Sequence, residues 1–263
     1  MQTAEELKKI VKEKYGDIVE KSTKSCGCCG GDEEMDYSVL AEDYAKLEGY
    51  NPEADLQLGC GIPTQYAKIK EGDTVVDLGS GAGNDCFVAR AITGKSGKVI
   101  GLDFTERMVA KARSNAERLG FSNVEFVLGE IESIPIQDNI ADVVVSNCVM
   151  NLVPDKVKAF EETYRILKKG GHFSISDIVL QGELPQGLRN DAAMYAGCIS
   201  GALQKEEYLS IVRKAGFKNL IVQVQKQIDL GKEIYLRYFS EQEMETFKKS
   251  SMGIYSITLN AEK

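Results

Sequence analysis

The feature that most restricts the fold of this chain is a glycine-rich turn between a short apolar run and a predicted helix. Residues 74–78 form the apolar run, which leads into Asp77-Leu-Gly-Ser-Gly-Ala-Gly83. An apolar run that stops at glycines is typical of a buried strand. Glycines also allow the backbone to turn sharply and approach a ligand closely. Because ligands of open α/β sheets bind at the carboxyl ends of strands, the sequence predicts a ligand site at residues 77–83.

The same alternation of strands and helices extends along most of the chain. Strands are predicted over residues 74–78, 98–103, 124–128, 141–146 and 172–179, and helices over residues 84–93, 105–119 and 154–167. We expect Thr105 to cap the second helix, and Gly170-Gly171 to end the third, which Pro154 opens. This order predicts βαβ units and a parallel, doubly wound α/β sheet.

The segments on either side of this core are less regular. Before it, we expect an amphipathic helix over residues 3–20, a polar loop over 22–32 and a short helix over 38–48. After Gly182 and Pro185, we expect a helix over residues 187–215 and strands over 219–229 and 253–261. The predicted division is N-terminal helices with a cysteine-rich loop (1–50), a cofactor-binding domain (51–182) and a smaller C-terminal α+β domain (183–263).

The spacing of the glycines indicates which nucleotide the turn would bind. A dinucleotide site needs G-x-G-x-x-G, but Asn84 follows Gly83, so the third glycine comes one residue early. The spacing matches the D-x-G-x-G-x-G loop of class I S-adenosylmethionine (SAM) methyltransferases. Asp103 ends the second strand, where its carboxylate can accept bonds from both ribose hydroxyls. The predicted cofactor-binding residues are Asp77, Gly79, Ser80, Gly81, Gly83, Asp85, Asp103, Phe104, Met108, Gly129, Glu130, Ile131 and Asn147.

Charge and hydropathy exclude other classes of function. The net charge is −8 and the pI is about 5.0, whereas binding to nucleic acid depends on clustered Lys and Arg. No apolar run approaches the roughly 20 residues that span a bilayer, and residues 1–10 lack the apolar stretch of a signal peptide. We therefore expect a cytoplasmic protein with no membrane or nucleic-acid partner. In that compartment the seven cysteines are reduced thiols and do not form a disulfide framework.

The cysteines differ in their sequence contexts. Cys148 directly follows the fourth strand, whose end points toward the reactive centre of a cofactor in this fold, and glycine precedes Cys198 and flanks Cys60 on both sides. Buried cysteines that only fill the core are nevertheless common, and we expect Cys86 to be one. The remaining three, Cys26, Cys28 and Cys29, form either part of a zinc site or a thiol relay in a glycine-rich loop. His172, the only histidine, is expected to be structural.

Five segments together resemble the arsenite methyltransferases, the SAM-dependent family that methylates trivalent arsenic. They are Leu58-Gly-Cys-Gly61, residues 76–87, Gly129-Glu-Ile-Glu132, Ser146-Asn-Cys-Val-Met-Asn-Leu152 and residues 189–202. They fall between about residues 25 and 205, and the chain after residue 205 is short for this family. Many methyltransferases share the nucleotide loop, whereas the contexts of Cys148 and Cys198 are more specific.

The resemblance implies a SAM cofactor and a set of arsenic ligands. Cys148 and Cys198 correspond to the main ligands and Cys60 to a third, redox-active cysteine, while the fourth is one of Cys26, Cys28 and Cys29. It also implies that the C-terminal domain carries part of the arsenic site. Trivalent arsenic is soft and prefers thiolates, and its lone pair can attack the methyl group without a general base. Each transfer formally oxidises arsenic, so thiols would have to reduce it again. The resulting disulfide would be reduced by exchange with a thiol reductant such as thioredoxin or glutathione.

Two alternatives remain open from the residues alone. A methyltransferase acting on a carbon or oxygen of a small organic molecule would explain the core and leave the cysteines incidental. A thiol-based protein that binds arsenic or a heavy metal would explain the cysteines, although such a protein has no need of a SAM loop. The sequence does not fix the number of methyl groups transferred, the preferred arsenical, the physiological reductant or the oligomeric state.

Overall fold

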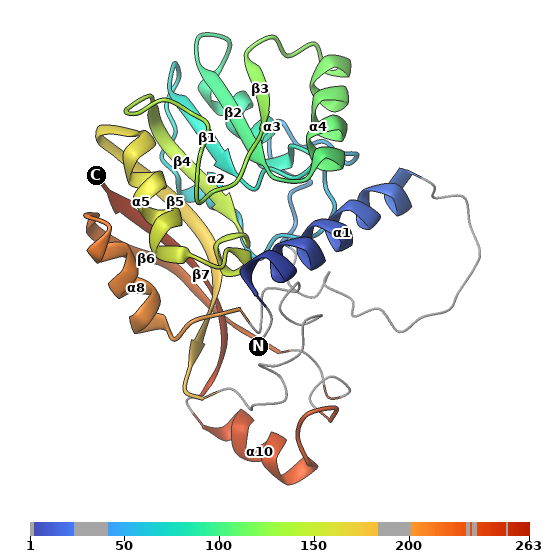
Figure 1. The fold of residues 1–263 in the computed structure, drawn as a ribbon, viewed down its shortest axis with the longest axis vertical. Helices are drawn as coiled ribbons and strands as arrows, with labels where there is room; N and C mark the ends of the chain where they lie inside the picture. Colours follow the sequence, from blue (N-terminus) through green and yellow to red (C-terminus); the bar gives the residue numbers. More distant parts are fainter. Residues whose placement is uncertain (1–2, 24–41, 184–200, 230–231, 233–235, 251) are drawn as a thin grey trace.

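The computed structural model describes residues 3–23, 42–183, 201–229, 232, 236–250 and 252–263. Its centre is a single seven-stranded sheet with the strand order β3-β2-β1-β4-β5-β7-β6 (Figure 1). The strands are β1 (Thr74–Leu78), β2 (Lys98–Asp103), β3 (Val124–Leu128), β4 (Ala141–Asn147), β5 (Leu167–Gln181), β6 (Lys218–Ile228) and β7 (Gly253–Glu262). Strands β1 to β5 pair in parallel, and β7 runs antiparallel to both of its neighbours, β5 and β6. The predicted α/β class and doubly wound core are confirmed.

Helices cover both faces of this sheet. On one face α3 (Asn84–Thr93) and α4 (Glu106–Arg118) pack on a cluster that includes Val75 of β1, and the short α2 (Pro63–Tyr66) lies against β5 and β7. On the other face α5 (Lys156–Ile166) and α8 (Lys205–Lys214) pack on a cluster that includes Val76. Neighbouring residues of a strand point to opposite faces, so β1 and β4 are apolar and buried along nearly their whole length.

The N-terminal helix α1 (Ala4–Thr23) lies outside these two layers. It crosses beside the carboxyl ends of the strands and contacts α4 (Figure 1). Its apolar stripe is half-buried to buried there, and Val11 is only 1% exposed. Helix α10 (Glu241–Lys249), which the sequence pattern did not predict, packs near the ends of β5 and β7. In the part of the chain that the structure describes, no helix has both the length and the apolar character needed to cross a bilayer.

The sequence predicts a helix over residues 38–48. The structure describes this region from residue 42, and residues 42–50 form turns instead of a helix. Side chains there bond to nearby backbone, as when Asp43 Oδ1 accepts from the N–H of Ala45 and Asn51 Oδ1 from that of Glu53. Such local bonds compete with the helical pattern. Of the helix predicted over 187–215, Lys205–Lys214 is helical, and residues 184–200 lie outside the described part.

Two predicted helix boundaries also differ. Helix α5 ends at Ile166, and Gly170-Gly171 lies within β5, where the pairing with β4 shifts register and Gly170 has φ +79°. The glycine pair therefore allows the irregular backbone at this point of the strand and does not end the helix. Thr105 does hold the position before α4, but its side chain makes no capping bond; its N–H donates to Asp103 Oδ1 instead.

The strands predicted after residue 218 are confirmed, but they do not form a sheet of their own. Strand β7 pairs with β5 from His172 to Gln181, so the expected boundary at residue 182 lies between two strands of one sheet. Helix α8 lies between β5 and β6 in the sequence and α10 between β6 and β7, so strands and helices still alternate beyond residue 182. The C-terminal strands thus extend the central sheet, and α8 and α10 pack on it, while the division into domains at residue 182 stays a prediction.

Candidate functional site

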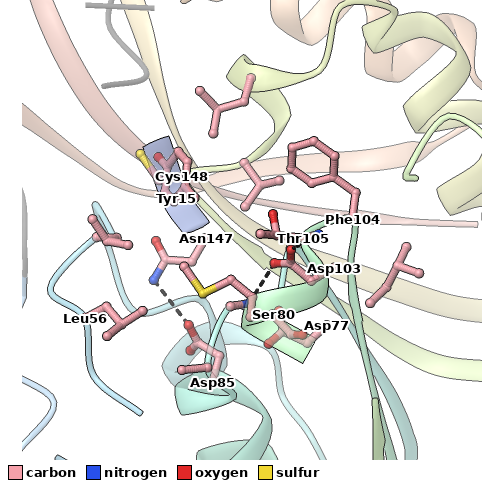
Figure 2. Close-up of a pocket in the computed structure, with 18 of the residues that line it drawn as sticks. Tyr15, Leu56, Asp77, Ser80, Asp85, Asp103, Phe104, Thr105, Asn147 and Cys148 are labelled. Carbon is pink, nitrogen blue, oxygen red and sulfur yellow. Dashed lines mark hydrogen bonds between the residues drawn. The ribbon is translucent and has the colours of Figure 1, made fainter. Parts of the chain in front are cut away.

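A pocket of about 1160 Å³, counting its open mouth, lies at the carboxyl ends of β1, β2, β3 and β4. Of the thirteen predicted cofactor-binding residues, twelve line it: Asp77, Gly79, Ser80, Gly81, Asp85, Asp103, Phe104, Met108, Gly129, Glu130, Ile131 and Asn147. Figure 2 shows Asp77, Asp85 and Asp103 grouped near the glycine-rich turn, with Asn147 and Cys148 further along the pocket. The thirteenth residue, Gly83, is not part of the lining. It has φ +99°, and an added Cβ would lie 2.9 Å from the Phe87 and Phe126 rings, so it serves the turn and its packing.

The glycine-rich turn is shaped by the end of the neighbouring strand. The N–H groups of Gly79 and Ser80 both donate to Leu102 O, and that of Gly81 donates to Asp103 Oδ2 at 3.0 Å. Gly79 has φ +73°, and a Cβ there would collide with Val149. At Gly81, with φ +52°, the nearest atom to an added Cβ is Met108 Sδ at 3.9 Å. The turn therefore leaves open space above Gly81, where a ligand can approach the backbone.

Three buried carboxyl groups give this end of the pocket its electrostatic character. Burial raises the pKa of Asp77, Asp85 and Asp103 above the ordinary value, and it raises that of Asp85 to about 6. Bonds from Tyr44, Asn147 and Thr64 partly offset the effect at Asp85, and backbone N–H groups do so at Asp103. Among the described lining residues Lys8 is the only basic one, and its ammonium contacts Glu130 and Glu132. The pocket therefore suits a ligand with positive charge and hydroxyl groups better than one with phosphates.

Asn147, at the end of β4, connects this acidic end to the segment around Cys60. Its Oδ1 accepts from the N–H of Cys60 at 3.0 Å, and its Nδ2 donates to Gly61 O and to the Tyr44 hydroxyl, both at 2.8 Å. The Tyr44 hydroxyl in turn donates to Asp85 Oδ1 at 2.9 Å. A continuous chain of hydrogen bonds thus runs from a carboxylate of the pocket to the backbone of a cysteine.

Cys148 and Cys60 lie close to the pocket and to one apolar cluster. Cys148 lines the pocket and has φ +61°, a left-handed conformation that is uncommon for a residue with a side chain. Cys60 is not in the lining, but its neighbour Gly59 is. The two cysteines are 3% and 2% exposed, and both belong to a cluster with Ile178, Leu180, Ala202, Ile228, Phe239, Met244, Phe247 and Ile254. The structure therefore brings these two predicted thiols to one region.

The other cysteines and the histidine divide into two groups. Cys26, Cys28, Cys29 and Cys198 lie outside the described residues. Cys86 is buried in the core and its thiol donates to Asp77 Oδ2 at 3.2 Å, as expected for a packing cysteine next to the pocket. The His172 ring contacts Ala67 O and has a structural place. Within the described ranges, no three His, Cys, Asp or Glu side chains are grouped so that they could hold a metal ion.

Several residues of the site escaped the sequence reasoning. Lys8, Val11 and Tyr15 reach the pocket from α1, and Tyr44 and Thr64 contact Asp85. The only available signal was the apolar stripe of the predicted helix over 3–20, which shows that one face must be buried but not against what. Nothing in the neighbourhood of Tyr44 or Thr64 marks them, because their partner is more than 20 residues away in the chain.

Comparisons with known proteins place this site in a family. A family model described as a methyltransferase domain matches residues 69–216. The arsenite methyltransferase of Halobacterium salinarum is 39% identical over 226 residues, which are 81% of this chain and 58% of that protein. The structure of an arsenic (III) S-adenosylmethionine methyltransferase from Chlamydomonas reinhardtii matches with a TM-score of 0.65 and 33% identity, over 78% of this chain and 67% of that one. This chain belongs to the arsenite methyltransferase family.

The chain matches only part of the length of these relatives. Human arsenite methyltransferase is 34% identical over 224 residues, again 81% of this chain and 58% of that protein. The chain thus spans less than two thirds of the length of the curated arsenite methyltransferases that it matches. The methyltransferase-domain match runs through residue 182, which agrees with the continuous sheet across the expected domain boundary.

Proposed function

We propose that this chain transfers a methyl group from SAM to trivalent arsenic held by cysteine thiolates. The observation that carries the proposal is the position of Cys148. It lines the same pocket as the three buried carboxyl groups and directly follows Asn147 at the end of β4. A soft thiolate in that position holds a soft acceptor next to the bound cofactor.

The residues of the pocket fit SAM. Open space above Gly81 leaves room for a ligand against the turn, and Ser80 Oγ and Asn84 Oδ1 are buried lining atoms with no partner among the described residues. Asp103 is placed to bind ribose hydroxyls, and Asp77 and Asp85 supply negative charge for a cationic amino acid end. The cofactor supplies an electrophilic methyl group on a positively charged sulfur. The chain's own part is to bind and orient the cofactor and to exclude water.

The acceptor is the lone pair of an arsenic centre bound by Cys148, Cys60 and Cys198. Arsenic(III) hydroxide exchanges its hydroxyl groups for thiols and releases water, so the thiol protons leave with the hydroxyl oxygens. The lone pair then forms the arsenic–carbon bond as the sulfur–carbon bond of the cofactor breaks. No base is required, and catalysis consists mainly of holding the two reactants in line. The apolar side chains around Cys60 and Cys148 restrict water at this point.

Each transfer formally oxidises arsenic from the trivalent to the pentavalent state. Two thiolates return two electrons by forming a disulfide, which we assign to Cys60 and one of Cys26, Cys28 and Cys29. A thiol reductant such as thioredoxin or glutathione then reduces that disulfide by exchange. The tie between Cys60 and Asn147 keeps the redox thiol next to the transfer site during this cycle.

Turnover with arsenite tests the proposal directly. Purified protein with SAM, arsenite and a thiol reductant should form methylated arsenicals, separated by chromatography with mass detection. Cys148→Ser should form none while its affinity for SAM, measured by calorimetry, stays within about threefold of the wild type, because the thiol is not needed to bind the cofactor. Absence of product from the wild type with SAM bound would refute the proposal and favour an organic carbon or oxygen acceptor.

A further inference from the structure

A buried acid that does not line the pocket lies next to the Cys148 segment. Asp177 of β5 is 0% exposed, yet its carboxyl group has three hydrogen-bond donors. Its Oδ1 accepts from Asn151 Nδ2 at 2.7 Å and from the N–H of Ile178 at 3.0 Å, and its Oδ2 accepts from the Tyr208 hydroxyl at 3.2 Å. Burial of a carboxyl group is unfavourable without such bonds. Retention of this group in the core therefore calls for a specific role.

The segment that Asp177 contacts begins where the strand ladder ends. The parallel pairing of β4 with β5 stops at Asn147 and Ser176, so residues 148–152 are not held by it. Cys148 then adopts φ +61°, and the 3-10 turn Met150–Leu152 follows. A left-handed residue with a side chain costs on the order of 1–3 kcal/mol and persists only when its surroundings fix it.

Three consecutive residues of β5 provide that fixation. The N–H of Cys148 donates to Ser176 O at 2.7 Å, and the amide of Asn151 donates to Asp177 Oδ1 and to Ile178 O at 2.6 Å. From the other side the Lys156 ammonium donates to Asn151 O at 3.1 Å and to Val153 O at 3.0 Å. The turn is thus bonded at its first residue and at Asn151, and the Asn151 side chain bonds the Asp177 carboxyl group.

We propose that Asp177 is a positioning residue, which acts through Asn151 to fix the Cys148 thiol in the lining of the cofactor pocket. It does not touch cofactor or substrate. Without its carboxyl group the 148–152 turn keeps the bonds from Cys148 N–H to Ser176 O and from the Asn151 amide to Ile178 O, but it loses the carboxyl contact that orients the Asn151 side chain. The thiol then samples orientations that do not face the pocket. This role serves arsenic binding, so its catalytic consequence rests on the proposed function.

The chemistry of the carboxyl group suggests a conservative variant. Burial raises the pKa of Asp177 to about 7, and the Lys156 charge and the Tyr208 hydroxyl partly oppose this rise. The neutral acid is therefore accessible near neutral pH, and the neutral amide of Asp177→Asn has nearly the same shape. Its oxygen can accept from Asn151 and Ile178, and its NH₂ group can donate to the Tyr208 oxygen. Asp177→Leu keeps the branched shape and the number of side-chain heavy atoms, is somewhat larger, and removes every acceptor.

Methylation kinetics separate positioning from general stability. Asp177→Leu should lower kcat with arsenite by about 30-fold or more and raise the KM for arsenite, while the Kd for SAM changes less than about threefold. Asp177→Asn should recover most of this loss. Val179→Ala is the matched control, since Val179 is fully buried on the same strand and face but takes no part in these bonds. It should lower the thermal midpoint and leave kcat nearly unchanged. A kcat in Asp177→Leu equal to that of Val179→Ala at similar stability would overturn the proposal.

A double-mutant cycle tests whether Asp177 acts through Asn151. If it does, Asn151→Leu should produce a loss similar to that of Asp177→Leu, and the double variant should be little worse than the poorer single one. Losses that multiply would show that the two residues act independently and would contradict the proposal.

The reactivity of the Cys148 thiol reports its placement without any arsenic chemistry. The rate of Cys148 alkylation by iodoacetamide is measured in the reduced protein by peptide mass spectrometry. It should be about tenfold faster in Asp177→Leu than in the wild type, because a loosened turn exposes the buried thiol. Asp177→Asn and Val179→Ala should react at the wild-type rate. A faster rate in Asp177→Leu together with a wild type that does not methylate arsenite would reject the proposed function and retain the positioning role. An unchanged rate would reject the positioning role itself.

Discussion

The two ends of the pocket region are built in different ways. The cofactor end consists of a turn and strand ends, with three carboxyl groups placed by the backbone of β1, β2 and α3. The thiol end consists of Cys60 and Cys148 surrounded by apolar side chains from β5, β7 and α10. The first end is polar and specified by short contiguous motifs, whereas the second is apolar and assembled from distant parts of the chain. A pocket that separates charge from apolar surface in this way can bind a cation at one end and shield a soft nucleophile at the other.

The hydrogen bonds of Asn147 are the physical connection between the two ends. One atom of its amide holds the Cys60 backbone, and the other contacts Tyr44 and Asp85. The acidic end and the Cys60 backbone are therefore joined through a single side chain.

Removal of Asp103 should have the largest effect on the cofactor end. Asp103→Ala eliminates the acceptor for the Gly81 and Thr105 N–H groups and the proposed acceptor for ribose hydroxyls. We expect the Kd for SAM to rise about 100-fold, equivalent to about 2.7 kcal/mol, as measured by calorimetry. Glu125→Ala is the control, because Glu125 lies on the outer strand β3, where it pairs with Lys98 at the surface. Equal affinities in the two variants would remove Asp103 from the cofactor site.

Replacement of Asn147 should impair methyl transfer more than it weakens SAM binding. Asn147→Ala removes the acceptor for the Cys60 N–H and the donor to Gly61 and Tyr44. We expect kcat for methyl transfer to fall about 20-fold, with a rise in the Kd for SAM of about fivefold at most, because the thiol segment moves while the glycine turn stays in place. Asn123→Ala is a matched control that loses three amide bonds, to Gly94 O, Gly97 O and Arg90 Nε, none of which involves a lining residue. An equal loss of kcat in both variants would indicate a general loss of stability.

The same contrast explains what the sequence could predict. The turn at residues 77–83 and the acid at Asp103 follow a local spacing, and the structure places these residues at the pocket as expected, apart from Gly83. The contact between Cys60 and Asn147 joins residues 87 positions apart, and no local pattern encodes it. The bond of Asn151 to Asp177 is equally long-range, because it depends on β5 lying next to β4. Sequence periodicity identifies a strand but not its neighbour, so β7 was expected while its place between β5 and β6 was not.

The pKa of Asp85 predicts a pH dependence for the cofactor end. Burial raises this pKa to about 6, so Asp85 is mainly ionised at pH 7 and mainly neutral at pH 5. A cationic ligand prefers the ionised form, and we expect the Kd for SAM to rise about tenfold between pH 7 and pH 5. The pKa of Asp85 is higher in the folded than in the unfolded state, so protonation of Asp85 between pH 7 and pH 5 stabilises the folded form. Titration of Asp85 therefore does not unfold the protein in this range, and the expected loss of affinity has another cause, the loss of its negative charge. Asp85→Asn should flatten the pH profile measured by calorimetry, and an unchanged slope would assign the titration to another group.

The smallest effect is expected where α1 contacts the pocket. Lys8 bonds Glu130 and Glu132 at 2.7 and 2.8 Å, but these side chains are partly exposed, and such pairs contribute little and are screened by salt. Lys8→Met should raise the Kd for SAM about threefold at low ionic strength and have less effect at 0.5 M salt, as a weaker hold on α1 opens the pocket. Lys9→Met is the matched control on the same helix, with a side chain that is 77% exposed and not part of the lining. If the Kd for SAM is the same in Lys8→Met and Lys9→Met at every salt concentration, the ion pairs of Lys8 do not matter. The apolar contacts around Val11 alone then hold α1 over the cofactor end.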